Sequence, residues 1–548
     1  MTDRPWWEDA VLYQVYPRSF QDTNGDGIGD LEGIRQRLDH FVDLGIDGVW
    51  ISPIYLSPMA DYGYDVSDYC DIDPSFGTLT DFDRLLAEMH ERGLRLILDF
   101  VPNHSSNLHP WFRESASGRD SALRDWYVWR DPAPDGGPPN NWRSRAGEYP
   151  AWTFDAGTGQ YYLHSFLPEQ PDLNWRNPAV QAAMLDVLRW WLDRGVDGFR
   201  VDVIYHLMKD PEFRDDPIDP TWEQGSSELP RLQPLHSIDH EDIHDVVRQM
   251  RRVLGEYAGD RLLIGEIYLP LERLVAYYGQ DADEAHLPFN FQLINAPWHA
   301  GSLLRMIREY EAAIPLHAWP NWVLGNHDQS RIASRIGPAQ ARVAMMLLLT
   351  LRGTPTLYYG DELGMLDVPI PADQIQDRFV GSGAVTGANR DPQRTPMQWD
   401  DGPHAGFTTV EPWLPIGSTS AVGSVARQAL QPTSMLALTR ALLALRRHHP
   451  ALLAGAWTPI AIDSDVLFYA RGEGEGKLLV ALNLDSVAKT VVFEHASQSA
   501  KIILSTGLDR VDEPISGTFR LGPDEGVIVA ARDVGANQAM RPVAAAGG

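Results

Sequence analysis

VDGFRVDV, residues 196–203, is the stretch that decides the fold, because it has the form of a short buried strand that ends on a carboxylate. Short β-branched apolar runs of this kind are typical of parallel strands that are buried on both faces. Such runs recur along the chain, and each is followed by a helical stretch. An eightfold alternation of strands and helices predicts an α/β fold that closes as a (β/α)8 TIM barrel. The other seven runs are VLYQVYP from Val11, IDGVWIS from Ile46, LRLILDFV from Leu94, RLLIGEI from Arg261, LPFNFQ from Leu287, NWVLGN from Asn321 and TPTLYYG from Thr354.

Polar residues stand at or just beyond the ends of these runs. In a (β/α)8 barrel the catalytic residues lie at the carboxyl ends of the strands, so we expect these side chains to gather at one end of the molecule. The residues that follow this rule are Asp99, Asn103, His104, Asp202, Glu266, His327 and Asp328.

Two long interruptions and a change of pattern predict further parts of the chain. The connection between the third and fourth runs is rich in Trp, Tyr, Gly and Pro and is too long for an ordinary loop, which indicates a small inserted domain. After about residue 450, short strands alternate with turn residues without long helices, as in a β-sandwich. The predicted organisation is a catalytic barrel over 1–104 and 171–450, an inserted domain over 105–170, a loop-rich insertion after the eighth strand over 361–432, a C-terminal antiparallel β-sandwich over 451–533 and a disordered tail over 534–548.

Composition excludes several classes of function. The formal net charge of −29, from 75 acidic and 46 basic residues, disfavours binding to nucleic acid or to an anionic membrane. No apolar window approaches the roughly 20 residues that span a bilayer. The single cysteine, Cys70, cannot form an internal disulfide, and the first ten residues lack the pattern of a secretion signal. We therefore expect a soluble cytoplasmic protein, monomeric or homodimeric, with a small neutral partner.

Two carboxylates have settings that suit different catalytic tasks. Arg200 and Asp202 are two residues apart on a strand, so both side chains point to one face and the guanidinium favours an ionised carboxylate, as a nucleophile requires. Glu266 is flanked by Ile and Leu, and desolvation raises a carboxyl pKa toward the range of a general acid. From these residues alone, a buried Arg200–Asp202 salt bridge and a surface position for Glu266 remain open alternatives.

Four segments resemble the short motifs of the α-amylase family of glycoside hydrolases, in the family's order and on the third, fourth, fifth and seventh strands. They are DFVPNH at 99–104, GFRVDVIYH at 198–206, GEIY at 265–268 and GNHDQSR at 325–331. A further segment, QPDLNW from Gln170, is similar to the α-glucosidase and oligo-1,6-glucosidase branch. The resemblance runs from about Trp7 through the C-terminal sandwich.

The resemblance implies a role for each matched residue. Asp202 is expected to be the nucleophile, Glu266 the general acid/base and Asp328 a carboxylate that binds and distorts the sugar. The pair would act by double displacement if its carboxylates lie about 5 Å apart, and with inversion at about 6.5–9.5 Å. The residues expected to bind substrate are Asp61, Tyr64, His104, Phe166, Arg200, His327 and Arg390, with Arg394 as a rival to Arg390.

A loop near the start of the chain is a candidate metal site. DTNGDGIGD places Asp22, Asn24 and Asp26 at alternate positions, as in the first half of an EF-hand, but the twelfth position is Gly33 and not Glu. A turn held by Asn and Asp hydrogen bonds is the alternative. The resemblance implies a structural Ca²⁺ or Mg²⁺ ion, and no organic cofactor, with the ion bound by Asp22, Asn24, Asp26, the Ile28 carbonyl and Asp30.

The expected function is that of a retaining, exo-acting α-glucosidase that releases terminal glucose from short α-glucosides, with possible transglucosylation. An Asp and Arg clamp on the far hydroxyls would leave room for one glucose. A dedicated glucosyltransferase, a sucrose isomerase and a trehalose-forming enzyme are alternatives, because they share the first chemical step. Val203 resembles the residue of α-1,6-preferring relatives. Transporter accessory subunits also look like this family, but they carry a membrane helix and lack the three carboxylates.

Overall fold

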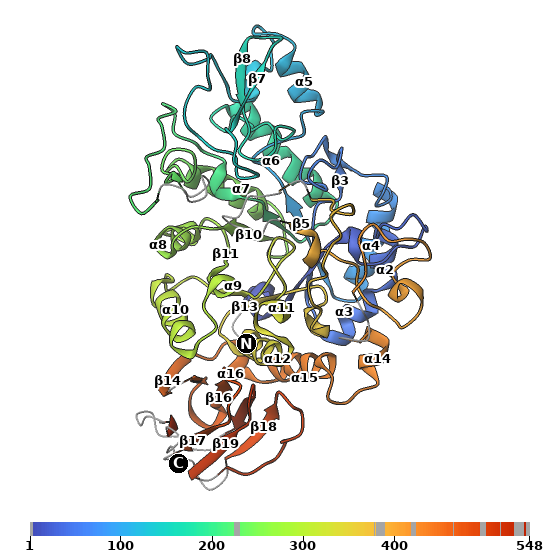
Figure 1. Cartoon of the computed structure of the whole chain (residues 1–548), viewed down its shortest axis with the longest axis vertical. Helices are drawn as coiled ribbons and strands as arrows, with labels where there is room; N and C mark the ends of the chain where they lie inside the picture. Colours follow the sequence, from blue (N-terminus) through green and yellow to red (C-terminus); the bar gives the residue numbers. More distant parts are fainter. Residues whose placement is uncertain are drawn as a thin grey trace.

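A central barrel carries one small domain at each end in the computed structural model (Figure 1). The structure describes residues 4–223, 231–377, 379, 389–417, 423–463, 465–493, 500–515, 517–530 and 542–543. The inserted domain lies above the barrel in the view of Figure 1, and the C-terminal domain lies below it. Among the described residues, no helix has both the length and the apolar character needed to cross a bilayer.

Eight parallel strands form the barrel, and all eight predicted runs contain one of them. The strands pair in the order β11-β10-β9-β5-β2-β1-β13-β12. Barrel strands that are neighbours in sequence lie side by side, so the chain winds once around the barrel. The bounds are β1 Leu12–Val15, β2 Gly48–Ile51, β5 Arg95–Phe100, β9 Gly198–Val201, β10 Leu262–Ile267, β11 Leu287–Asn290, β12 Asn321–Val323 and β13 Thr354–Tyr358.

A side chain closes the barrel between β11 and β12. Asn321 Oδ1 accepts a hydrogen bond of 2.9 Å from the Asn290 backbone N–H, and Asn321 Nδ2 donates one of 2.5 Å to the Pro288 carbonyl. Pro288 has no N–H to give to a strand ladder. The amide side chain of Asn321 therefore supplies the donor and acceptor that main-chain pairing supplies elsewhere in the barrel.

Alternation along the strands explains why polar groups collect at one end. Leu12, Ile97 and Ile264 belong to one apolar cluster that is built from several barrel strands. Two residues further along each strand, on the same face, stand Gln14, Asp99 and Glu266. The face that is apolar in the lower part of the barrel thus becomes polar and charged at the carboxyl ends.

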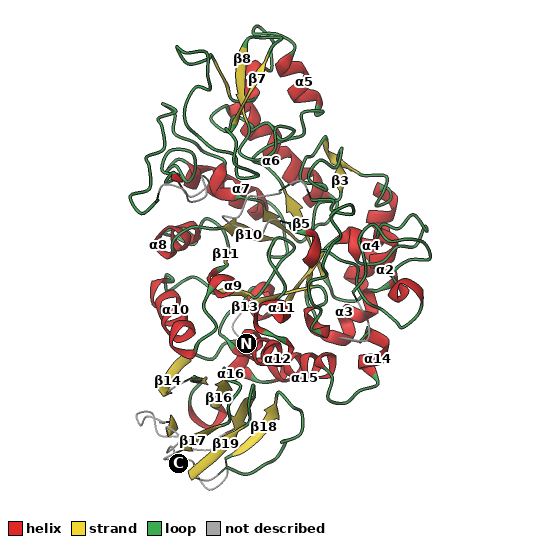
Figure 2. Ribbon diagram, in the orientation of Figure 1, coloured by secondary structure: helices red, strands yellow, loops and turns green. Residues whose placement is uncertain are grey.

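Helices cover the outside of the barrel (Figure 2). α12 is buried over most of its length because α15 and the C-terminal domain both pack on it. The helices that follow the barrel strands are α2 Leu31–Gln36, α3 Leu38–Leu44, α4 Leu79–Glu91, α6 Pro178–Asp193, α7 Ile243–Gly255, α8 Leu271–Leu274, α9 Gln292–Asn295, α10 Ala300–Ala313, α11 Ile332–Ile336, α12 Pro338–Thr350 and α15 Met435–His448.

The inserted domain is a small three-stranded antiparallel sheet with one helix. Its strands are β6 Trp129–Arg130, β7 Trp152–Asp155 and β8 Gln160–Leu163, in the order β6-β8-β7, and its helix is α5 Pro110–Ala116. Trp142, Trp152 and Leu163 form its own apolar cluster. The domain follows β5, the third strand of the barrel, as predicted.

The segment after β13 is loop-like over its described residues. It contains the short turns η6 Asp361–Leu363, η7 Asp391–Gln393 and η8 Pro403–Gly406, and the helix α14 Val425–Ala429. Part of the predicted insertion over 361–432 lies outside the described residues.

The C-terminal domain consists of two antiparallel sheets. The five-stranded sheet has the order β14-β15-β16-β20-β18, and the three-stranded sheet has the order β19-β17-β21. In the predicted tail, Pro542–Val543 form β21 beside β17, and the other residues of 534–548 lie outside the described residues. The remaining strands are β14 Trp457–Asp463, β15 Val466–Arg471, β16 Leu478–Asn483, β17 Lys489–Phe493, β18 Lys501–Ser505, β19 Gly517–Leu521 and β20 Gly526–Ala530.

Candidate active site

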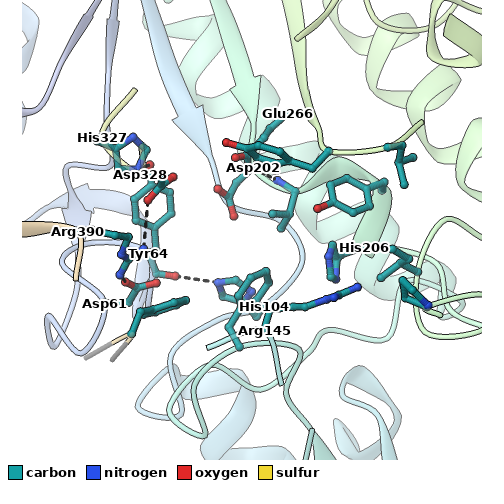
Figure 3. A pocket seen from close by; sticks show the side chains of 18 of the residues that line it. Asp61, Tyr64, His104, Arg145, Asp202, His206, Glu266, His327, Asp328 and Arg390 are labelled. Carbon is teal, nitrogen blue, oxygen red and sulfur yellow. Dashed lines mark hydrogen bonds and ion pairs between the residues drawn. The ribbon is translucent and has the colours of Figure 1, made fainter. Parts of the chain in front are cut away.

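A pocket of about 320 Å³ opens at the carboxyl ends of the barrel strands (Figure 3). This volume is in the range of small-molecule sites. The barrel supplies the floor, and Phe166 of the inserted segment supplies part of the wall. The predicted site residues that line the pocket are Asp61, Tyr64, His104, Phe166, Asp202, Glu266, His327, Asp328 and Arg390.

Arg200 lies beneath the pocket and joins three carboxylates. It is completely buried, and its Nη1 lies 2.7 Å from both Asp99 Oδ1 and Asp202 Oδ1. Its Nη2 lies 2.7 Å from Glu266 Oε2. One guanidinium therefore fixes Asp202 and Glu266 relative to each other, across two neighbouring strands.

The sequence predicted a guanidinium beside Asp202 and an apolar environment around Glu266. The second part of this prediction is wrong, because Arg200 contacts both carboxylates. Burial raises the pKa of Asp202 well above its usual value, and Arg200 opposes this shift only in part. Burial also raises the pKa of Glu266, again against the attraction of Arg200. With Asp99 included, three buried carboxylates share one cation, and like charges this close favour keeping a proton in the cluster. A retained proton is what a general acid needs.

The residue after Asp202 has a strained backbone. Val203 has φ 36° and ψ 47°, a left-handed conformation that is unfavourable for a β-branched residue. In this conformation its N–H donates a hydrogen bond of 2.9 Å to Glu266 Oε2. The turn that ends β9 therefore holds the Glu266 carboxylate beside Asp202.

A network of two arginines and three carboxylates closes one end of the pocket. Arg390 Nη2 lies 2.8 Å from Asp61 Oδ1 and 2.7 Å from Asp377 Oδ1, and its Nη1 lies 3.2 Å from Asp328 Oδ1. Arg394 lies behind the lining, with its Nη2 2.9 Å from Asp328 Oδ1. Of the two arginines, Arg390 thus pairs with Asp61 and lines the pocket.

The same arginines keep Asp328 ionised. Burial alone would raise its pKa, but His327, Arg390 and Arg394 together lower the pKa below the usual range. Asp328 is therefore a charged acceptor on the pocket wall, and its pKa is shifted in the opposite direction to that of Glu266.

Neutral histidines and a glutamine complete this end of the pocket. Burial lowers the pKa of His104 to about 4, so the ring is neutral near pH 7. Gln170 Nε2 lies 3.0 Å from Asp61 Oδ2 and 3.1 Å from His104 Nε2. The Tyr64 ring stacks on His327, and its hydroxyl lies 2.8 Å from His327 Nε2. The QPDLNW segment thus contributes to the site through Gln170.

Other lining residues stand outside the predicted set. Tyr205 and His206 follow the nucleophile candidate in η3, which spans Ile204–His206, and Arg145 comes from the inserted domain. Asp377, which holds Arg390, comes from the long loop after β13. No pattern in the sequence marks Arg145 or Asp377. The signal that could have found His206 is its place four residues after Asp202, inside the matched segment at 198–206.

The candidate metal loop is folded by its own hydrogen bonds. Asp22 accepts from the backbone N–H groups of Asn24 and Gly25, and Asp30 caps α2 through the Gly33 N–H. Among the described residues, no three His, Cys, Asp or Glu side chains gather as a metal site requires. The donor set is nonetheless all oxygen, as Ca²⁺ and Mg²⁺ prefer, and no described residue donates to the Ile28 carbonyl. The donors fit a hard cation, and the metal stays a prediction.

Comparison with known proteins gives consistent matches over most of the chain. Residues 14–455 match the model of the alpha amylase catalytic domain. An alpha-glucosidase of Culex pipiens is 42% identical over 501 residues, which cover 89% of this chain and 83% of the relative. An oligo-1,6-glucosidase of Heyndrickxia coagulans is 38% identical, with 91% of this chain and 95% of the relative covered.

Solved structures agree with this result. An alpha-glucosyl transfer enzyme superposes with a TM-score of 0.89 at 38% identity and covers 97% of this chain and 100% of its own. An isomaltulose synthase variant of Erwinia rhapontici, in complex with sucrose, superposes with a TM-score of 0.89 at 36% identity, with 97% and 100% covered.

Proposed function

Since the chain belongs to the alpha-amylase family of glycoside hydrolases, we propose that it is a retaining α-glucosidase that removes one terminal glucose at a time from short α-glucosides. The observation that carries this proposal is that Asp202 and Glu266 both contact the Arg200 guanidinium at the floor of the pocket. One end of this pocket is closed by the salt bridge between Arg390 and Asp61.

The proposed reaction has two steps. Asp202 attacks the anomeric carbon while Glu266 protonates the departing oxygen, which leaves a glucosyl ester on Asp202. Glu266 then removes a proton from water, which attacks the same carbon from the face that the leaving group occupied. Two inversions give net retention. The shared contact with Arg200 and the Val203 N–H bond to Glu266 support a close carboxylate pair.

The closed end accounts for the proposed exo action. Asp61 and Arg390 form a buried ion pair that Asp377 reinforces, so a longer sugar chain has no exit beyond this point. Asp328 is ionised and accepts hydrogen bonds from sugar hydroxyls more strongly as the ring distorts, which lowers the barrier. One glucose binds between this clamp and Asp202.

Separate incubation with maltose, isomaltose and sucrose tests hydrolysis against transfer. We expect free glucose as the main early product from at least one of these sugars, with transfer products rising at high sugar concentration. Water and sugar hydroxyls compete for the same intermediate, and about 1.4 kcal/mol between their barriers shifts the product ratio tenfold. Chromatography of early time points measures this ratio.

Other product patterns would favour the alternatives. A sucrose isomer formed with little free glucose or fructose would favour an isomerase, for which the likeness to the isomaltulose synthase is the supporting observation. Larger oligosaccharides with fructose but no free glucose from sucrose, or with only the one glucose per transfer that leaves from maltose or isomaltose, would favour a dedicated transferase. The same three incubations report the preferred linkage, for which the only pointer is that Val203 resembles the residue of α-1,6-preferring relatives.

We also propose a structural Ca²⁺ or Mg²⁺ ion, held by Asp22, Asn24, Asp26, Asp30 and the Ile28 carbonyl. When bound, it would cross-link the loop that packs against the segment after β13. Chelation is then expected to lower the melting temperature, because an ion that binds only the folded state stabilises it.

Thermal melting with and without a chelator measures this effect. Calcium or magnesium added back should restore the original melting temperature. A variant with Asn24→Ala and Asp26→Ala removes two exposed donors, so its melting temperature should not respond to the chelator. An unchanged melting temperature of the parent protein after metal removal would end the metal proposal.

We also propose a cytoplasmic location, because the single cysteine, Cys70, cannot form the internal disulfides that are common in oxidising compartments.

A further inference from the structure

Two side chains on the pocket wall have polar atoms that no described residue bonds to. His206 is 2% exposed, and its buried Nδ1 has no hydrogen-bond partner among the described residues. Arg145 is partly buried, lines the same pocket, and forms no side-chain hydrogen bond or ion pair with any described residue. A buried imidazole and a guanidinium both lose free energy when they leave water unpaired. Arg145 is open to the pocket, so its missing partner is to be sought there, whereas the buried Nδ1 of His206 is out of a ligand's reach.

The two side chains lie together on the leaving-group side. Figure 3 shows His206 across the cavity from Asp61 and Arg390, with Asp202 and Glu266 between the two sides and Arg145 extending toward His206. Both residues also line a small cavity that adjoins the pocket. Since the closed end holds the glucose that is transferred, a group at Arg145 belongs to the part of the substrate that departs.

Charge distinguishes Arg145 from the other arginines of the site. Arg200 pairs with Asp99 and Asp202, and Arg390 pairs with Asp61. Arg145 has no carboxylate of the described chain within ion-pair distance. Guanidinium and carboxylate groups match in planar, two-point geometry, and such charge-assisted bonds are the strong ones.

Next to it, His206 is a neutral group. Burial lowers the pKa of this imidazole well below its usual value, and the charge of Arg145 adds to the effect. A neutral ring can donate one hydrogen bond to an oxygen without adding charge. The pair thus offers one cation and one neutral donor to a group rich in oxygen.

We propose that Arg145 and His206 bind the leaving group, and that Arg145 selects α-glucosides whose leaving group carries a carboxylate. This inference rests on the proposed α-glucosidase function, because it assigns the leaving group to the side of the pocket that the glucose does not occupy. It names a substrate class, acidic α-glucosides, in which the substrate supplies the counter-charge that Arg145 lacks.

A pair of synthetic substrates tests the inference. The α-glucosides of 4-carboxyphenol and 4-carbamoylphenol have similar size, and differ in charge at neutral pH. The measured quantity is the ratio of kcat/KM for the acidic substrate to kcat/KM for the neutral one. We expect a ratio above one for the parent enzyme, with a roughly tenfold to hundredfold fall in Arg145→Gln. Arg145→Lys, which keeps the charge, should retain part of the preference.

Two controls separate recognition from general effects. Arg113→Gln makes the same charge change at an exposed position of the inserted domain, so its ratio should equal that of the parent. Added salt should lower the parent's ratio, because screening weakens a partly exposed ion pair.

Failure of the inference is distinguishable from failure of the proposed function. Cleavage of both substrates with a ratio of one or less, or a ratio that Arg145→Gln leaves unchanged, would overturn the inference and leave the α-glucosidase function in place. Cleavage of neither substrate by the parent enzyme would count against both.

Discussion

Asp202→Asn is expected to lower kcat by at least about 10⁴-fold on every α-glucoside, because the amide cannot form the glucosyl ester. The change is nearly isosteric, and the amide can still bond to Arg200 through its oxygen. Circular dichroism and the melting temperature should therefore stay close to those of the parent enzyme. Residual turnover above about a hundredth of the parent's would overturn the assignment of Asp202.

A chemical rescue makes the test specific. Asp202→Ala leaves a space that azide can enter, and azide attack on an activated α-glucoside would give β-glucosyl azide with a single inversion. Glu266→Gln is the matched comparison: it should hurt poor leaving groups most, since activated aryl glucosides need less proton donation. Recovery of α-configured product from Asp202→Ala with azide would contradict the nucleophile role.

Arg200→Met is expected to be the most destabilising change at the site, by about 3–5 kcal/mol. It leaves Asp99, Asp202 and Glu266 buried without their cation. Burial already raises the pKa of all three carboxyls in the folded protein. Without Arg200 these pKa values rise further. The measurement is the melting temperature of the variant and the parent at pH 5 and pH 8.

The sign of the pH effect follows from proton linkage. A carboxyl whose pKa is raised on folding binds its proton more tightly in the folded state, so its contribution to stability is complete at low pH and is lost as pH rises through the folded pKa. The deficit of Arg200→Met relative to the parent should thus be larger at pH 8 than at pH 5. Arg200→Lys, which keeps a charge, should show a smaller deficit, and an equal deficit at both pH values would contradict this account.

Local patterns in the sequence were sufficient for the barrel and for most of the pocket. Side chains alternate along a strand, so Asp99 lies on the same face as the buried Ile97, and Glu266 on the same face as the buried Ile264. The positions of the strand ends in the sequence were therefore enough to predict that these carboxylates gather at one end of the barrel. Contacts between strands depend on how neighbours are staggered around the barrel, which no single segment encodes. For this reason only the structure reveals the contact of Arg200 with Glu266, and with it the cation that opposes the rise in the pKa of Glu266.

Residues contributed by loops were the other gap. Asp377 and Arg145 lie far from any barrel strand end in sequence. Arg145 reaches the pocket, and Asp377 reaches Arg390, through long connections whose course follows from tertiary packing. His206 lies inside a matched segment, but a histidine taken by itself is more often a packed core residue than a functional one. Its lack of a partner becomes visible only when the surrounding atoms are known.

The closure of the barrel by Asn321 gives the molecule a preferred place to open. Everywhere else in the barrel a ladder of main-chain bonds must break, whereas between β11 and β12 two bonds from one side chain carry the connection. Glu266 stands on one side of this seam and Asp328 follows β12 on the other. Parting of the seam on warming would separate the acid from the sugar-binding carboxylate while the rest of the barrel persists. Thermal inactivation of the enzyme would then precede its unfolding.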